Sequence, residues 1–151
     1  MNGQLGGLDD VQETREQGSN VIPEEKFEKK RKAFHFWEVN GNSYKLKLQT
    51  GMISKLENKY RRNLLNIVSD DGIPPLTVML TIVQAAITPW EHGISYQKVE
   101  ELYDIWVEKD GGSQATLLSH VIIPTMAVSG FFTPAQADSI VKSLEDSMEL
   151  I

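Results

Sequence analysis

The chain has 151 residues, a length that suits a single domain with a modest core. Its formal net charge of −6 at pH 7 argues against nucleic-acid binding and against attachment to an anionic membrane, because both need a basic face. It contains no cysteine, which excludes disulfides, thiolate metal sites and cysteine nucleophiles. Since no signal-peptide pattern and no bilayer-length apolar run is visible, we expect a soluble, cytoplasmic protein.

Residues 1–31 are predicted to form a flexible or partly helical N-terminal arm. From Met1 to about Ile22 the chain has almost no large apolar side chains, so it cannot bury enough surface to offset the entropy lost on ordering. The following run, 24–32, changes from acidic to basic along its length, an order that matches a helix macrodipole. A single domain is expected over residues 32–151.

Period-two alternation of apolar and polar residues over 34–48 predicts a β-hairpin that turns near Asn40-Gly41. The second half of this segment contains one apolar row, which consists of Tyr44, Leu46 and Leu48. The length of the turn decides which residues of the first half share a face with this row. A two-residue turn, Asn40-Gly41, places His35 and Trp37 beside it.

A three-residue turn, Val39-Asn40-Gly41, with Gly41 in the left-handed region, instead places Phe34 and Phe36 beside the apolar row. We favour this register because it separates Lys45 and Lys47 from the two phenylalanines. An isolated hairpin is only marginally stable, so we expect its apolar face to pack on the helices that follow.

Several helices follow, and capping residues or prolines mark where they begin. The predicted starts are Thr50, Asn63, Pro74-Pro75, Ser95, Ser113 and Thr133. The segment from Leu76 to about Thr88 has its polar residues in one narrow stripe, so we expect it to form the buried centre of the fold. Pro124 leaves the carbonyl of His120 without its usual donor, which predicts a kink. The predicted fold is α+β, mainly α: an N-terminal β-hairpin packed on about five to six helices.

The sequence contains no recognisable catalytic, cofactor or metal site. Its three histidines, His35, His92 and His120, are far apart in the chain and form no HxxxH pair, and we interpret His120 as structural. There is no P-loop, no GxSxG elbow and no GxGxxG motif. Asp70-Asp71-Gly72 lacks the alternating ligands and the closing glutamate of a calcium loop. We therefore predict a protein that is not an enzyme and binds no cofactor or metal.

Protein–protein contact remains as the expected mode of action. Large aromatic residues dominate the energetics of cores and interfaces alike, and most of those in this chain are expected to fill the core. The alternative is an exposed cluster that receives a helix from another chain. The candidates for such a partner-binding face are Met79, Val83, Trp90, Trp106, Phe131 and Phe132.

Several short segments resemble a group of proteins from phages and prophages of Gram-positive bacteria, the tail assembly chaperones. The similar segments are 72–80 (GIPPLTVML), 92–94, 99–104, 111–113 and 129–132, together with the Asn40-Gly41 hairpin and residues 62–65. The resemblance covers about residues 33–132 and consists of spaced short matches rather than one signature.

This resemblance implies a function and partners. Tail assembly chaperones are taken to bind the long, hydrophobic, helical tape measure protein in the host cytoplasm, to keep it soluble, and to help the tail tube protein polymerise around it. They are absent from the finished particle. Self-association is a further expectation, and the family has no catalytic residues to carry over. The alternative function is a structural tail component, a completion or connector protein, that stays in the virion.

Overall fold

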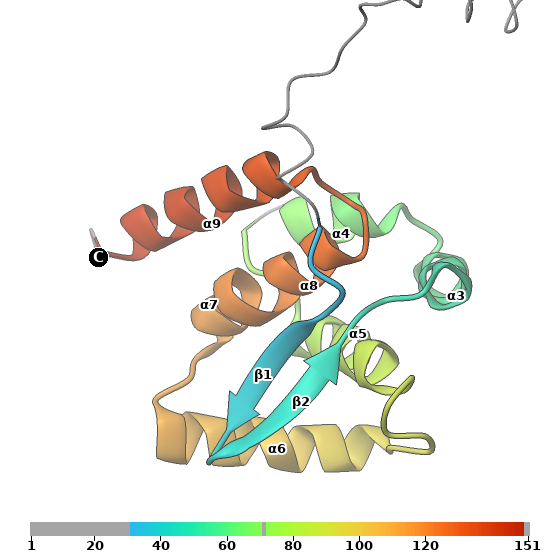
Figure 1. The fold of residues 1–151 in the computed structure, drawn as a ribbon, viewed down its shortest axis with the longest axis vertical. Helices are drawn as coiled ribbons and strands as arrows, with labels where there is room; N and C mark the ends of the chain where they lie inside the picture. Colours follow the sequence, from blue (N-terminus) through green and yellow to red (C-terminus); the bar gives the residue numbers. More distant parts are fainter. Residues whose placement is uncertain (1–30, 71, 150–151) are drawn as a thin grey trace, which may run out of the picture. The chain divides into compact units, whose positions relative to one another are not determined.

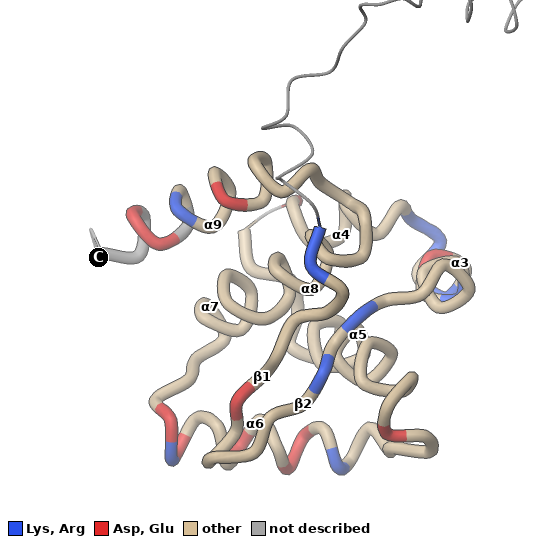
Figure 2. Tube along the Cα trace, viewed as in Figure 1, with Lys and Arg blue, Asp and Glu red and all other residues tan. Residues whose placement is uncertain are grey.

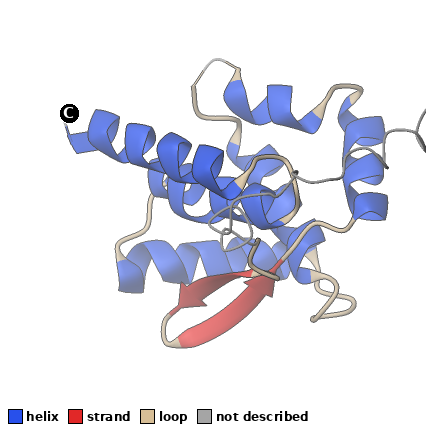
Figure 3. Ribbon diagram, turned by 45° about the horizontal axis from the view of Figure 1, so that its top comes forward, coloured by secondary structure: helices blue, strands red, loops and turns tan. Residues whose placement is uncertain are grey.

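The computed structural model of the protein describes residues 31–70 and 72–149, apart from the side chains at 144 and 147–149. Within this part of the chain, a two-stranded antiparallel hairpin packs against a compact set of helices (Figures 1 and 3). The fold is therefore α+β and mainly α, as predicted. The predicted arm, residues 1–31, lies outside the described residues except for Arg31. None of the described helices is long and apolar enough to cross a membrane.

The hairpin consists of two strands, β1 (His35–Val39) and β2 (Asn42–Leu46). Asn40 and Gly41 join them with φ angles of 49° and 86°. Positive φ at both central residues defines a type I′ turn, for which Asn-Gly is the preferred sequence. Trp37 consequently pairs with Tyr44 across the hairpin. The favoured three-residue turn is wrong, and the two-residue alternative is confirmed.

The register decides which aromatic side chains reach the core. The inner face of the hairpin buries Trp37, Val39, Leu46 and the following Leu48. The outer face leaves Phe36 46% exposed. The three-residue turn would keep the lysines and phenylalanines apart, but in the structure the Lys45 ammonium lies 4.7 Å from the centroid of the Phe34 ring. A cation over an aromatic face is attracted to it, so lysine and phenylalanine side chains can share a face of the hairpin.

Helix α5 (Leu76–Ile87) forms the centre of the fold, as predicted, and Pro75 is its N-cap residue. Its buried residues are Met79, Leu80, Ile82, Val83, Ala85, Ala86 and Ile87. The helix contacts α3 (Thr50–Tyr60), α6 (Tyr96–Asp110) and β2. At its C-terminal end the Ala86 carbonyl accepts a hydrogen bond from the Lys47 N–H (3.0 Å), which ties the hairpin to α5.

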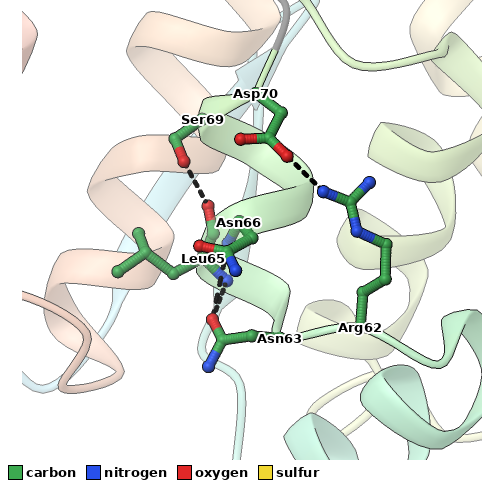
Figure 4. Close-up of polar contacts among 6 residues, drawn as sticks. All are labelled: Arg62, Asn63, Leu65, Asn66, Ser69 and Asp70. Carbon is green, nitrogen blue, oxygen red and sulfur yellow. Dashed lines mark hydrogen bonds and ion pairs between the residues drawn. The ribbon is translucent and has the colours of Figure 1, made fainter.

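Between α3 and α5 lies the short helix α4 (Leu64–Ser69), which is stabilised by polar contacts at both ends (Figure 4). As predicted, Asn63 is its N-cap: the side-chain oxygen accepts a hydrogen bond from the Leu65 N–H at 2.9 Å. Arg62 pairs with Asp70, so an ion pair joins the residues flanking the helix. Before α3 the cap is Gln49 rather than the predicted Thr50, which is the first helical residue.

The remaining helices begin and end close to their predicted boundaries. Ser95 caps α6, and Gly111 ends it in the left-handed conformation with φ 74°. Ser113 forms a capping box with Thr116 at the start of α7 (Gln114–Thr116). Thr133 and Gln136 exchange hydrogen bonds at the start of α9 (Pro134–Glu149), which confirms the helix start predicted at Thr133.

The helix that contains Pro124 departs from regular α geometry. It runs from α7 through the π-helical segment η1 (Leu117–Ile122) into α8 (Ile123–Val128). π-Helical turns often occur where a helix must absorb an irregularity, and here the irregularity is the missing N–H of Pro124. The carbonyl of His120 instead accepts a hydrogen bond from His35 Nε2 at 2.8 Å.

Candidate partner-binding surface

An exposed aromatic cluster lies on the outer face of the hairpin. It consists of Phe34, Phe36, Trp90 and Lys45, and we call it the outer aromatic patch. The ring centroids of Phe34 and Phe36 are 5.1 Å apart, and those of Phe34 and Trp90 are 5.7 Å apart, both in edge-to-face geometry. Phe36 and Trp90 are 46% and 39% exposed. Contiguous exposed aromatic side chains are a feature of protein–protein interaction surfaces.

Two parts of the chain build the patch. Strand alternation puts the phenylalanines and Lys45 on the same outer face, because Phe36 pairs with Lys45 across the hairpin. Trp90 comes from the turn after α5, where its backbone N–H donates a hydrogen bond to the Ile87 carbonyl at 2.9 Å. The bond from the Lys47 N–H to Ala86 joins this end of α5 to the hairpin, which brings Trp90 to Phe34.

The patch carries positive charge although the protein as a whole is acidic. The Lys45 Nζ lies 4.7 Å from the Phe34 ring centroid and 6.0 Å from that of Trp90. Figure 2 shows basic residues along β2 and both acidic and basic residues along α6. On the same strand face, the Glu38 carboxylate accepts a hydrogen bond from Ser43 Oγ at 2.6 Å. The outer hairpin face therefore combines exposed aromatic rings with an ammonium group that lies over one of them, Phe34.

A second aromatic group, on the inner face of the hairpin, is structural. Trp37 meets Trp106 of α6 edge to face at 5.7 Å between centroids, and Tyr103 lies 6.0 Å from Trp106. Both tryptophans are buried. These rings fasten β1 to α6, so they are not available to a partner in this conformation.

The structure buries most of the residues that the sequence selects for a partner-binding face. Of the six, Met79, Val83, Trp106 and Phe132 are buried in the core. Phe131 is partly buried against the core. Only Trp90 lies in the exposed patch. Phe34 and Phe36 are not among the residues that the sequence selects for this face, because the predicted three-residue turn puts them inside. The Asn-Gly turn signal, given more weight, would have placed them outside.

Beside Trp90, a shallow and polar depression of about 390 Å³ opens to solvent. It is lined by Tyr44, Glu91, His92, Gly93, Ile94, Ser95 and Lys98. The Ser95 hydroxyl is occupied as the cap of α6, accepting from the Lys98 N–H at 3.0 Å.

Two of the three histidines have structural partners. His35 donates to the His120 carbonyl, and the His120 ring contacts Ser119 Oγ at 2.7 Å and Glu145 at 2.9 Å. Burial lowers the pKa of the His35 imidazole. In the described part of the chain, no three His, Asp or Glu side chains form a group that could hold a metal ion.

The chain was compared with protein-family models, curated proteins and solved structures, and none of them matches it.

Proposed function

We propose that this protein is a phage tail assembly chaperone that binds the hydrophobic, helical tape measure protein, keeps it soluble and promotes assembly of the tail tube. The observation that carries the proposal is the outer aromatic patch, with Phe36 46% and Trp90 39% exposed. Its second support is the resemblance of the short segments between residues 33 and 132 to that family. The protein acts through contact and makes or breaks no covalent bond.

The patch suits reversible binding of an amphipathic helix. An apolar helix face gains free energy by covering exposed rings, at about 25 cal/mol per Å² of apolar surface removed from water. Three aromatic side chains form a small site, so a single helix is expected to bind it weakly. Weak contacts dissociate fast, which a chaperone needs because the tape measure must later leave it for the tube.

The resembling segments also fit the geometry of the patch. Residues 72–80 lead into α5 and form its first turn, and residues 92–94 belong to the turn that follows Trp90. The Asn40-Gly41 turn sets the register that exposes Phe36. The segments that carry the resemblance are therefore among those that position the exposed rings.

Co-expression with the tape measure protein encoded by the same phage tests the proposal. Wild type is expected to keep the tape measure in the soluble fraction, and Phe36→Ser with Trp90→Ser is expected to leave it in the pellet. Ile73→Ser is the matched control, because Ile73 is also 46% exposed but is not part of the patch. A tape measure that precipitates equally with and without the wild-type protein would contradict the chaperone role.

The composition of the mature particle gives an independent check. A chaperone leaves the tail before the particle is complete, so mass spectrometry of purified virions is expected to find none of this protein. Its presence in stoichiometric amounts would contradict the proposal and would favour a structural tail component.

A further inference from the structure

Lys45 lies over Phe34, the ring of the outer aromatic patch that contacts both Phe36 and Trp90. Its ammonium is 4.7 Å from the centroid of the Phe34 ring and 6.0 Å from that of the Trp90 ring. Phe36 is its cross-strand neighbour. Any partner that covers Phe36 and Trp90 together must therefore also cover the Lys45 ammonium.

Covering an ammonium group has a cost that depends on the partner. A buried charge without a counter-charge is strongly unfavourable, whereas a paired and hydrogen-bonded one is tolerated. The aromatic rings offset only part of the lost hydration. A purely apolar helix, or one with a cation at this point, would leave Lys45 unpaired in the interface. A helix with a carboxylate there would pair with it.

We propose that the outer aromatic patch selects an amphipathic helix that carries an Asp or Glu beside its apolar stripe, and that Lys45 is the residue that reads this carboxylate. The inference rests on the proposed function in taking the patch as the partner surface, and it adds the chemistry of the partner segment. The selection operates by rejection, since partners without the carboxylate bury an unpaired charge. Lys45 thus gives the aromatic site specificity that the rings alone do not have.

A protein helix fits this surface better than a nucleic acid does. Positive charge and aromatic rings also describe sites for single strands, but those sites track several phosphates along a basic groove. Here the outer hairpin face also carries Glu38, and Glu91 directly follows Trp90. A phosphate backbone would bring a row of negative charges near these carboxylates, whereas the proposed helix brings a single carboxylate, which pairs with Lys45.

Binding of three synthetic helices tests the inference. The peptides have roughly 18 residues and one apolar stripe, and they differ only in one residue beside the stripe, which is Glu, Gln or Lys. Titration calorimetry at low salt is expected to show that wild type binds the Glu peptide roughly tenfold more tightly than the Gln peptide, and the Lys peptide most weakly. In Lys45→Met the preference for Glu is expected to disappear.

Lys59→Met is the matched control. Lys59 also lies over an aromatic ring, 5.7 Å from the Tyr60 centroid, but it belongs to α3. This variant is expected to keep the wild-type preference. Equal affinity of wild type for the Glu and Gln peptides would overturn the inference. So would an undiminished preference in Lys45→Met.

Two further results would assign the patch to another occupant and overturn the inference. One is an oligothymidylate that binds more tightly than the Glu peptide and depends on Lys45. The other is self-association of the protein in sedimentation experiments that Lys45→Met abolishes. The co-expression experiment separates the two proposals: if Lys45→Met keeps the tape measure soluble as well as wild type does, only the role of Lys45 fails.

Discussion

At the residue scale, His35 supplies the hydrogen-bond donor that Pro124 lacks. Pro124 has no N–H to donate to the His120 carbonyl, and His35 Nε2 donates to that carbonyl at 2.8 Å. A carbonyl can only accept, so the proton lies on Nε2 of the His35 ring. The start of β1 is thereby joined to the π-helical segment through the His120 carbonyl, which has no donor from Pro124.

This bond predicts how stability depends on pH. Burial is the main cause that lowers the pKa of His35 from its ordinary value of 6.5; the bond to His120 opposes the shift, and the charges of Lys32 and His120 add to it. Because the folded pKa lies below the unfolded one, the unfolded chain takes up the proton first as the pH falls. The stabilising contribution of neutral His35 is therefore complete above pH 6.5 and is lost as the pH drops below it.

The variant His35→Gln isolates this effect, because an amide N–H can still donate to the His120 carbonyl but does not titrate. Urea unfolding is measured at about pH 7.5 and about pH 5.5. The wild type is expected to lose more unfolding free energy than His35→Gln over this interval, while other titrating groups contribute equally to both proteins. The same loss in both would show that His35 is not the group responsible.

At the element scale, the two-residue turn fixes the whole hairpin. Gly41 has φ 86°, and a Cβ there would meet no atom within 4 Å, so replacing it strains only the backbone. Gly41→Ala is expected to lower the unfolding free energy by about 1–2 kcal/mol. Gly51→Ala is the matched control: it also has open space around it, but it lies within α3. This change is expected to raise stability by up to about 1 kcal/mol.

Urea unfolding of both variants checks the prediction. Loss of stability at Gly51 as well as at Gly41 would mean that the added methyl group, and not the left-handed backbone, is responsible.

The elements differ in how well the sequence predicts them, and the reason is physical. Helix starts such as those at Asn63, Ser95 and Thr133 are set by hydrogen bonds within a few residues, so local sequence is sufficient. The register of the hairpin depends on which face the helices cover, which is a tertiary property. The partner of the His120 carbonyl, His35, lies 85 residues earlier in the chain, so no local signal near Pro124 identifies it.

The candidate surface shows the same difference between local and tertiary information. The sequence predicts α5 as the buried centre of the fold, and burial there of Met79 and Val83 follows from that prediction. A buried helix offers neither of these side chains to a partner. Trp90 is exposed because it follows the end of the helix, where burial is incomplete. The contacts that make a patch, such as Phe34 with Trp90, join distant parts of the chain and require the fold.

At the scale of the whole molecule, the hairpin divides its aromatic residues between two tasks. Trp37 faces inward and meets Trp106, whereas its neighbour Phe36 faces outward to solvent. Adjacent residues of one strand thus contribute to the core on one side and to the proposed interface on the other. Folding and binding can therefore be separated by single substitutions at adjacent positions.

Trp37→Ala is expected to lower the unfolding free energy by about 3–5 kcal/mol, because it empties a buried site between β1 and α6. That loss is a large fraction of the roughly 5–15 kcal/mol that stabilises a domain.

Phe36→Ala removes an exposed ring and is expected to change stability by less than about 1 kcal/mol. Its effect is expected instead on the tape measure, which should lose solubility in co-expression. Urea unfolding and the soluble fraction measure the two effects independently. If Phe36→Ala destabilised the fold as much as Trp37→Ala does, the outer rings would be part of the core, and the face proposed for the partner would not exist.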